Sequence, residues 1–524
     1  MVWHIFKKDW KLLWPFFLAV AATQFIPSII RLKLGLFGEN RALQELLDLF
    51  GVIAFVGSAS LIAAVVHQDS IPGVRQDWLV RPIRRRDLLL AKFSFVLVLA
   101  QGPFFVADLL QALASGFPLR QSLVAAISRA LVLLLSFTLP VFAFASLTQN
   151  SSEAIVGGVA FFFLFFVFQM LANAVYGSSG YLDPAGGTGA QWVTDSTRSL
   201  VLLLGASTIL GVQYLRRKTV SSRWLAAIVF VLFMLAEFLP WKSVFAFEQR
   251  LSPNSSVGRS VSVAFDPSMG KFQRPSGMTM SDEEMWRHLR QEGGTKSELF
   301  LPLHVSGLPS DAILKADKSE IRLIGSDGRV AYSGNGADLE IRKEGPSDGQ
   351  ATIYQEVDIP DTFYGRLKNQ PLRLEVDYSL TLFRLGSAFG IPALGGDQRA
   401  PGLGWCETQM NESGTAIELH CMQAGQGPTC RTVFLVNVST GLRNPVKSDC
   451  SPDYSPYFQQ FGPDAISSFG TNLPFRDPSG LAHFPVDGPQ LPKSQVVLRL
   501  YQPEDHFTRR LVISAVRLED WESR

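Results

Sequence analysis

The 524-residue sequence has almost no net charge, only four cysteines, and no apolar run after residue 241 that is long enough to span a bilayer. Its 48 Lys and Arg residues nearly balance 46 Asp and Glu residues, and the formal net charge is +2. This balance argues against a nucleic-acid-binding protein, which would normally have a strongly basic face. The 39 Phe and 10 Trp residues exclude a disordered chain.

The sequence also lacks motifs of common enzyme classes. It has no Gly-x-x-x-x-Gly-Lys-Ser/Thr phosphate loop, so it does not hydrolyse ATP by that route. It has no His-Glu-x-x-His zinc motif either. The neighbouring residues Glu504, Asp505 and His506 could suggest acid–base chemistry, but we interpret them as an exposed loop tip. We therefore expect a chain that is not an enzyme and holds no cofactor or metal.

Long apolar segments are concentrated before residue 242. A membrane-spanning helix needs roughly 20 apolar residues, because its backbone must satisfy its own hydrogen bonds in hydrocarbon. We predict about seven spans, at 13–30, 49–67, 93–114, 123–147, 154–176, 199–214 and 224–241. Six or eight spans are the alternatives. The first span also has features of a signal peptide, with small residues at Ala19–Ala22. We expect an α-helical polytopic membrane domain over residues 1–241.

The basic residues of the short loops predict the orientation, because positive charge collects on the cytoplasmic side. With the N-terminus inside, the cytoplasmic set is Lys7, Lys8, Lys11, Arg75, Arg81, Arg84, Arg85, Arg86, Lys92, Arg216, Arg217, Lys218 and Arg223. The opposite side has only Arg31, Lys33, Arg41, Arg120 and Arg198. An odd number of spans then places the C-terminal half outside.

From residue 242 onward, short runs alternate apolar and polar residues, which is typical of half-buried antiparallel strands. These runs lie at 260–265, 320–325, 372–383, 416–421, 432–438, 496–501 and 510–518. A single helix is expected at 281–293, where Ser281 and Glu284 give a start signal. We predict a mostly β, sandwich-like extracytoplasmic domain over residues 242–524, with one large or two small sandwiches.

All four cysteines lie in this second half, at Cys406, Cys421, Cys430 and Cys450. None forms the close Cys-x-x-Cys pair that is usual in zinc sites. Four cysteines in a half placed outside indicate two disulfides in an oxidising compartment. Three pairings are possible, and four unrelated buried thiols are the alternative.

The segment 67–93, HQDSIPGVRQDWLVRPIRRRDLLLAKF, is too long and too charged for a plain connection between two spans. Asp69 and Pro72-Gly73 give turn chemistry, Trp78 suits the headgroup level, and Pro82 breaks the chain. The segment presents a basic, partly apolar surface to the cytoplasm. Topology-setting arginines alone are the simpler interpretation, but they leave the Trp, the Arg-Pro-Ile sequence and the length unexplained.

Here the sequence resembles the type-2 ABC transporter permeases of bacteria. The resemblance rests on these residues of the segment: Asp69, Gly73, Trp78, Arg81, Pro82, Ile83, Arg85, Leu88, Leu89, Ala91 and Lys92. It implies that this segment, including Arg84 and Arg86, docks on a separate ATP-binding subunit, which carries the ATP and Mg. The N-terminus MVWHIFKKDWK also resembles the interfacial helix of that family.

The resemblance further implies a bacterial inner-membrane protein that works with a second permease protomer, as a homodimer or heterodimer. It covers roughly residues 1–215. The seventh span and the large C-terminal domain depart from the six-span pattern of the family, which leaves the gating details open. We expect an exporter in a lipid bilayer, with an envelope partner of the C-terminal domain as a further possibility and no nucleic acid.

Two other functions stay open. The chain could be a non-transporting membrane anchor that displays a disulfide-bonded binding module, or a device in which ATP hydrolysis moves the C-terminal domain without moving a substrate.

Within the bilayer, Asp108 and Arg129 fall at matching depth on adjacent spans. Because an intramembrane charge is costly, they are expected to pair, either as a clamp between helices or along a substrate path.

Overall fold

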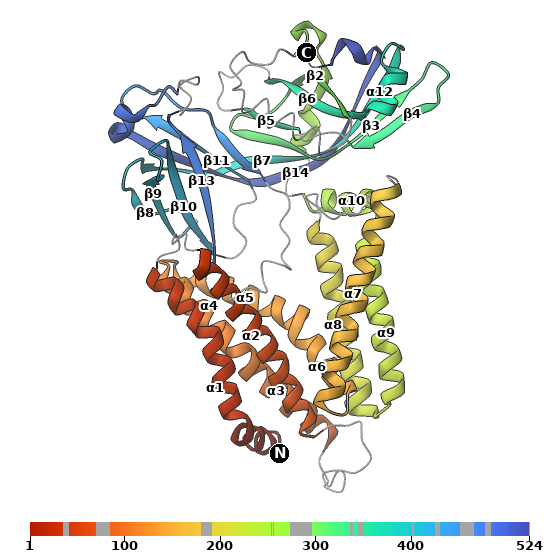
Figure 1. The fold of residues 1–524 in the computed structure, drawn as a ribbon, viewed down its shortest axis with the longest axis vertical. Coiled ribbons are helices and arrows are strands. Elements are labelled where there is room, and N and C mark those ends of the chain that lie inside the picture. The colour runs from red at the N-terminus through yellow and green to blue at the C-terminus, as the bar shows by residue number, and fades with distance from the viewer. Residues whose placement is uncertain are drawn as a thin grey trace.

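The computed structural model consists of a helical bundle followed by a β-rich domain (Figure 1). It describes residues 1–34, 41–69, 84–179, 191–252, 254, 256–272, 296–335, 339–343, 351–400, 403–424, 430–450, 466–476 and 484–522. The predicted order of a helical and then a mostly β region is therefore confirmed. The helix expected at 281–293 lies outside the described residues.

Among the described residues, six helices are long and apolar enough to cross a membrane. They lie within α1 (Val2–Leu34), α2 (Arg41–His67), α3–α4 (Arg85–Ala114), α5–α6 (Leu119–Leu147), α7 (Ser151–Ser179) and α8 with its last turn (Gln191–Arg216). The helix α9 (Thr219–Leu235) is apolar but shorter, at 17 residues. A seventh span remains a prediction. A short helix, α10 (Trp241–Leu251), leads to the β domain.

Two of the long helices are interrupted midway by π-helical turns. Val96–Gln101 separates α3 (Arg85–Phe95) from α4 (Gly102–Ala114), and Leu134–Thr138 separates α5 (Leu119–Leu133) from α6 (Leu139–Leu147). Each turn is followed within two residues by a proline, Pro103 or Pro140. Proline lacks an N–H and its ring clashes with the carbonyl four residues earlier, and a π turn relieves that clash. The Gln101 amide bonds to the Thr138 hydroxyl between the two turns.

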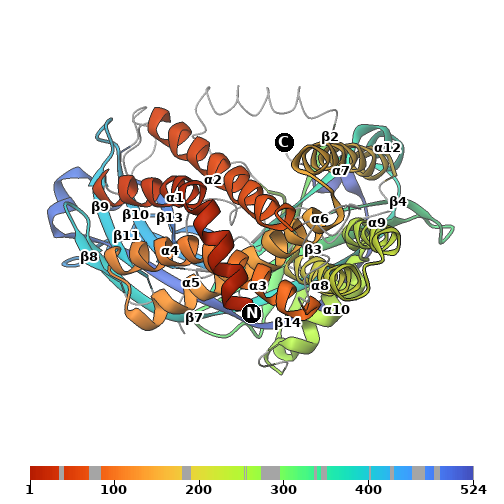
Figure 2. The same ribbon diagram turned by 90° about the horizontal axis from the view of Figure 1, so that it is seen from below.

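The helices form two groups, α1–α6 and α7–α9. In Figure 2, α1, α2 and α4 lie on one side of the bundle, α7–α9 lie on the other, and α6 lies between them. A shared apolar core joins the groups at the end that is distant from the β domain, here called the distal end. Phe95, Phe142, Leu210 and Tyr214 belong to this core. The end next to the β domain is called the proximal end. There, α10 lies crosswise between α8 and the β domain (Figure 1).

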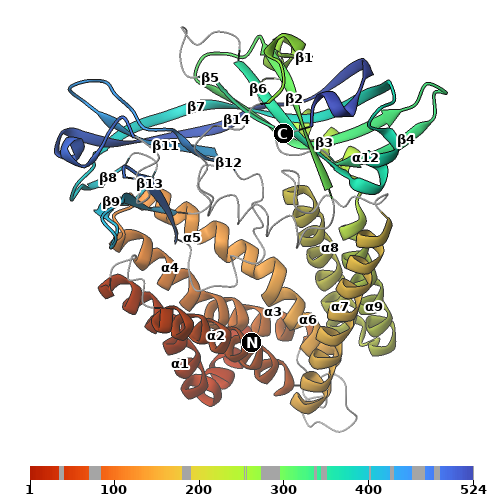
Figure 3. The same ribbon diagram turned by 45° about the horizontal axis from the view of Figure 1, so that its top comes forward.

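The described residues of the β domain form three antiparallel sheets (Figure 3). One sheet has the order β1-β2-β6, with β1 (Ser262–Phe265), β2 (Lys296–Ser306) and β6 (Ala351–Pro360). A second has the order β13-β10-β9-β8, with β13 (Ile466–Pro474), β10 (Ala416–Ala424), β9 (Trp405–Met410) and β8 (Asp397–Arg399).

The third sheet has the order β12-β11-β14-β7-β3-β4, and β5 also pairs with β3. Its strands are β12 (Lys447–Cys450), β11 (Cys430–Asn437), β14 (Ser494–Val516), β7 (Leu372–Pro392), β3 (Ala312–Ile324), β4 (Val330–Asn335) and β5 (Glu340–Lys343). The strands β7 and β14 have 21 and 23 residues, far longer than the five or six residues of an average strand. They pair from one end of the domain to the other.

The long sheet serves two sandwiches at once. At one end it packs on the three-stranded sheet and on α12 (Asp361–Leu367), around Leu303, Val376 and Leu380. At the other end it packs on the four-stranded sheet, around Leu419 and Leu498. The two small sandwiches that alternating runs allowed are therefore present, but they share one sheet.

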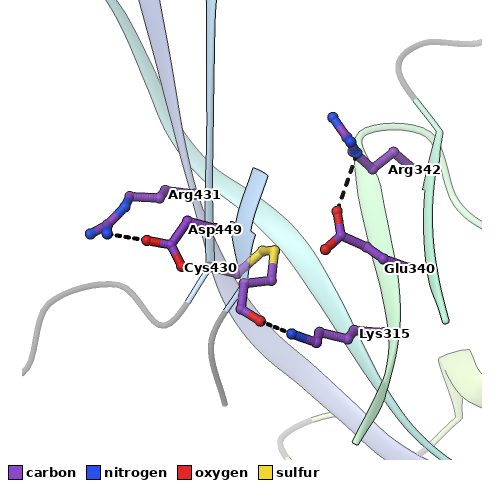
Figure 4. Close-up of a disulfide and its surroundings, with 7 residues drawn as sticks. Lys315, Glu340, Arg342, Cys430, Arg431 and Asp449 are labelled. Carbon is purple, nitrogen blue, oxygen red and sulfur yellow. Dashed lines mark hydrogen bonds and ion pairs between the residues drawn. A yellow bond between two sulfur atoms is a disulfide. The ribbon is translucent and has the colours of Figure 1, made fainter. Parts of the chain in front are cut away.

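The four cysteines form two disulfides, as predicted, with the pairing that the sequence left open. Cys406 bonds to Cys421 across β9 and β10, and Cys430 bonds to Cys450 across β11 and β12. Figure 4 shows the second bridge, where Lys315 donates to the Cys450 carbonyl and where ion pairs lie nearby, Arg431–Asp449 and Glu340–Arg342. All four cysteines are buried.

Candidate functional site

The segment 67–93 joins α2 to α3 at the distal end of the bundle, and the structure describes both of its ends. Of the residues singled out in it, the described ones are Asp69, Arg84, Arg85, Arg86 and Lys92. The others lie outside the described residues, and they are Gly73, Trp78, Arg81 and Pro82. Near these described ends, Asp69 and Lys92 are both buried.

Lys92 stands at the centre of a buried ion cluster between α1, α2 and α3. Its Nζ lies 2.8 Å from Asp9 Oδ2 and 2.7 Å from Asp69 Oδ2. The same ammonium donates a 2.7 Å hydrogen bond to the Val65 carbonyl. On its outer side, Asp69 Oδ1 lies 2.9 Å from Lys8 Nζ. Two carboxylates are thus balanced by two ammonium groups, and Lys92 is only 1% exposed.

The sequence places these charges by ordinary helical geometry. Leu88, Ala91, Lys92 and Phe95 are all buried on α3, and their spacing of three and four residues puts them on one face. The apolar members of that face fill the bundle core, so Lys92 enters it too. Burial opposes ionisation of Asp69, but the contacts with Lys92 and Lys8 outweigh it and hold the pKa of the Asp69 carboxyl below its ordinary value.

The three arginines at the start of α3 are exposed. Arg84 precedes the first turn, and its carbonyl accepts the hydrogen bonds of Asp87 and Leu88. Arg85 donates a 2.7 Å hydrogen bond to the Leu215 carbonyl at the end of α8. The distal surface next to 70–83 therefore carries guanidinium groups that an acidic or phosphate-bearing surface could contact.

Further contacts fasten the neighbouring helix ends. His67 Nε2 lies 2.9 Å from the Thr148 hydroxyl, which links the end of α2 to the end of α6. Arg223 of α9 lies 2.8 Å from Glu153 of α7 and donates to the Leu147 carbonyl. The segment 67–93 consequently begins and ends among helix ends that side-chain contacts hold together at the distal end of the bundle.

Asp108 and Arg129 are brought together between α4 and α5. Arg129 Nη1 donates to Asp108 Oδ1 at 2.6 Å, and the two side chains are 4% and 1% exposed. Both residues belong to the antiparallel hairpin that turns at 115–118. A contact this close, with both partners buried inside one hairpin, supports the clamp between helices over the substrate path.

The interpretation of Glu504, Asp505 and His506 as an exposed loop tip was wrong. The three residues lie inside β14, and pairing with β7 continues past them through a shift in register. Asp505 is 1% exposed and accepts a 2.7 Å hydrogen bond from the Gly258 N–H. Pro503 looks like a turn residue in the sequence, but a proline is also tolerated at a bulge.

Sequence reasoning missed Asp9, whose partner Lys92 is 83 residues away. The available signal was a single acidic residue among the basic residues of the N-terminal helix.

Sequence reasoning also missed a Gly-x-Ser-x-Gly sequence at residues 345–349, which lies outside the described residues. The flanking elements β5 and β6 are strands, whereas a nucleophile elbow needs a strand followed by a helix.

Within the described parts of the chain, no group of three or more His, Cys, Asp or Glu side chains is placed to hold a metal ion. Comparison with the models of known protein families gives no match. No curated protein matches the sequence significantly.

Proposed function

We propose that this chain is the membrane-spanning permease subunit of an ABC transporter, acting as an exporter and driven by a separate ATP-binding subunit that docks on residues 67–93. The observation that carries the proposal is the buried cluster of Asp9, Asp69 and Lys92, which ties both ends of that segment to α1. A segment that only connected two spans would not need its ends fixed by buried charges.

The cluster gives the coupling a physical route. Asp69 follows α2, Lys92 lies in α3 and Asp9 lies in α1, so a push on the segment moves the distal ends of three helices together. Removing one partner would leave an unpaired buried charge, which costs about 3–5 kcal/mol. Moving the distal ends of α1, α2 and α3 together therefore costs less free energy than separating them.

The predicted orientation of the chain gives the compartment of each end. The distal end is the cytoplasmic end, the β domain lies outside, and the two disulfides suit an oxidising compartment there. The protein belongs to a bacterial inner membrane, works with a second permease protomer, and leaves ATP and Mg to the partner subunit.

A second function is a device in which ATP hydrolysis moves the β domain without moving a substrate. One observation favours it: the β domain contacts both helix groups, through α4–α5 and through α10. Movement of the helices would then move the β domain, with or without a substrate. A membrane anchor that merely displays a module would need neither contact.

The test is affinity purification in mild detergent of the wild type and of Arg81→Glu/Arg85→Glu. We expect a subunit with a phosphate loop to co-purify with the wild type and to be lost from the variant. The matched control is Arg216→Glu/Lys218→Glu, which makes the same charge change at exposed positions between α8 and α9. Loss from both variants would point to general charge attraction, and absence of an ATPase from all three samples would reject the proposal.

A further inference from the structure

The β domain touches the bundle first at the turn between α4 and α5. Phe117 in this turn is 3% exposed and packs with Ala112 and with Ile466 of β13. Two glycines allow the close approach. A Cβ at Gly404 would lie 2.6 Å from the Phe117 ring, and a Cβ at Gly116 would lie 2.7 Å from the Trp405 indole nitrogen.

The second contact lies on the other helix group, at α10. Trp241, Val244 and Phe245 are buried there in a cluster with Val193 of α8. Trp241 and Phe245 of this cluster also contact the long sheet. Trp241 Nε1 lies 3.4 Å from the Ser379 hydroxyl of β7.

Polar groups of the long sheet complete this second contact. Glu248 of α10 is buried and lies 3.9 Å from His506 of β14. The Phe245 ring meets the His506 imidazole edge-on, and the backbone N–H of His506 donates a 3.0 Å hydrogen bond to the hydroxyl of Ser252. The helix α10 thus contacts both α8 and the strand pair β7–β14.

A continuous pair of strands connects the two contacts. The strands β7 and β14 pair from Gln495–Pro392 to Val516–Leu372. Their end near Ile391 packs on the four-stranded sheet, which holds Phe117, and their middle at Ser379 and His506 holds α10. Figures 1 and 3 show this ribbon passing over both helix groups.

We infer that the β domain is a strap that holds the proximal ends of the two helix groups at a fixed separation. The groups share an apolar core at the distal end, with Phe142 against Tyr214, and Gln213 donates to the Ser146 carbonyl there. Near the β domain, the contacts described above run through the strap instead. The strap needs no ATPase, so this inference stands apart from the proposed transport function.

The experiment measures distances between pairs of spin labels, with the full chain in lipid nanodiscs. The outer pair, which lies towards the proximal end, is Val124→Cys on α5 with Leu235→Cys on α9. The control pair, which lies towards the distal end, is Leu90→Cys on α3 with Val220→Cys on α9. All four positions are exposed, and the four native cysteines are held in disulfides, so only the introduced cysteines react.

The strap is weakened in two ways, by Phe117→Ala and by Gly404→Val. The matched control is Gly365→Val, because a Cβ at Gly365 meets no atom within 4 Å. We expect the outer pair to give one narrow distance distribution in the wild type and in Gly365→Val. Both strap variants should give a broader distribution that extends to longer distances.

The control pair reports whether a variant keeps its fold, and it should not change in any of the samples. Trp241→Ala weakens the other contact of the strap, at α10, and should also broaden the distance distribution of the outer pair. A narrow, unshifted outer pair in Phe117→Ala, Gly404→Val and Trp241→Ala would overturn the inference, because the helices alone would then hold the separation.

Discussion

The ammonium group of Lys92 lies 2.8 Å from the carboxylate of Asp9, and neither side chain has more than 1% of its surface exposed. The ion pair links α3 to α1, and Asp69 joins it from the end of α2. Because a charge buried without a partner is far more costly than an exposed one, this contact fixes three helix ends relative to one another.

Replacing Lys92 is therefore expected to destabilise the bundle strongly. Lys92→Met leaves two buried carboxylates without their main partner, which should cost about 3–5 kcal/mol of unfolding free energy. Lys8→Met is the control, because Lys8 is 53% exposed and its pairs should contribute only about 0–1 kcal/mol. Unfolding in detergent, followed by circular dichroism, compares the two. Equal effects would contradict the account of the cluster.

The pair Asp108–Arg129 can be tested as a clamp. Arg129→Met alone should destabilise by about 3–5 kcal/mol, since it leaves the Asp108 carboxylate buried. The double variant Asp108→Leu/Arg129→Met removes both charges and should recover most of that loss. If the double variant is stable but loses transport, the pair belongs to a substrate path instead.

The His506 side chain predicts a dependence on pH in the β domain. Burial lowers the pKa of His506 from 6.5 to about 4, and its side chain is 13% exposed. The unfolded chain takes up a proton near pH 6.5, while the folded chain resists it until about pH 4. Stability is therefore full above pH 6.5 and falls as the pH drops towards 4, by about 3 kcal/mol in total.

Thermal unfolding of the wild type and of His506→Asn at pH 7.5 and pH 4.5 measures this effect. The asparagine variant should lose less stability between the two pH values than the wild type. An equal loss in both proteins would show that His506 contributes nothing to the pH dependence.

The predicted orientation has a direct chemical test in intact cells. Val220→Cys lies at the distal end and Val330→Cys lies in the β domain, and both positions are exposed. A membrane-impermeant maleimide should label Val330→Cys in intact cells and Val220→Cys only after lysis. The reverse pattern would place the β domain in the cytoplasm.

Much of the fold was predictable because its signals are local. Apolar runs located the long helices, and alternating runs located β1, β3, β7, β10 and β11. The runs 496–501 and 510–518 were also strands, but they form one strand, β14. The residues between them resemble a turn, but pairing with β7 continues there and the chain stays extended.

The candidate site was predictable in part for the same reason. The charge and length of segment 67–93 are visible in the sequence, and matching depth suggested that Asp108 pairs with Arg129. The partner of Lys92 was not predictable, because Asp9 looks like one more polar residue of an amphipathic helix. Contacts between residues so far apart depend on how the helices pack, which a single sequence does not report.

Site-specific photocrosslinking tests most directly whether segment 67–93 touches an ATP-binding subunit. A photoreactive amino acid is placed at Trp78, and at Trp224 of α9 as a control that is 70% exposed. We expect a crosslink from position 78, and not from position 224, to a protein that carries a phosphate loop. Crosslinks from position 78 to lipid alone, or equally from both positions, would contradict the docking of an ATP-binding subunit on this segment.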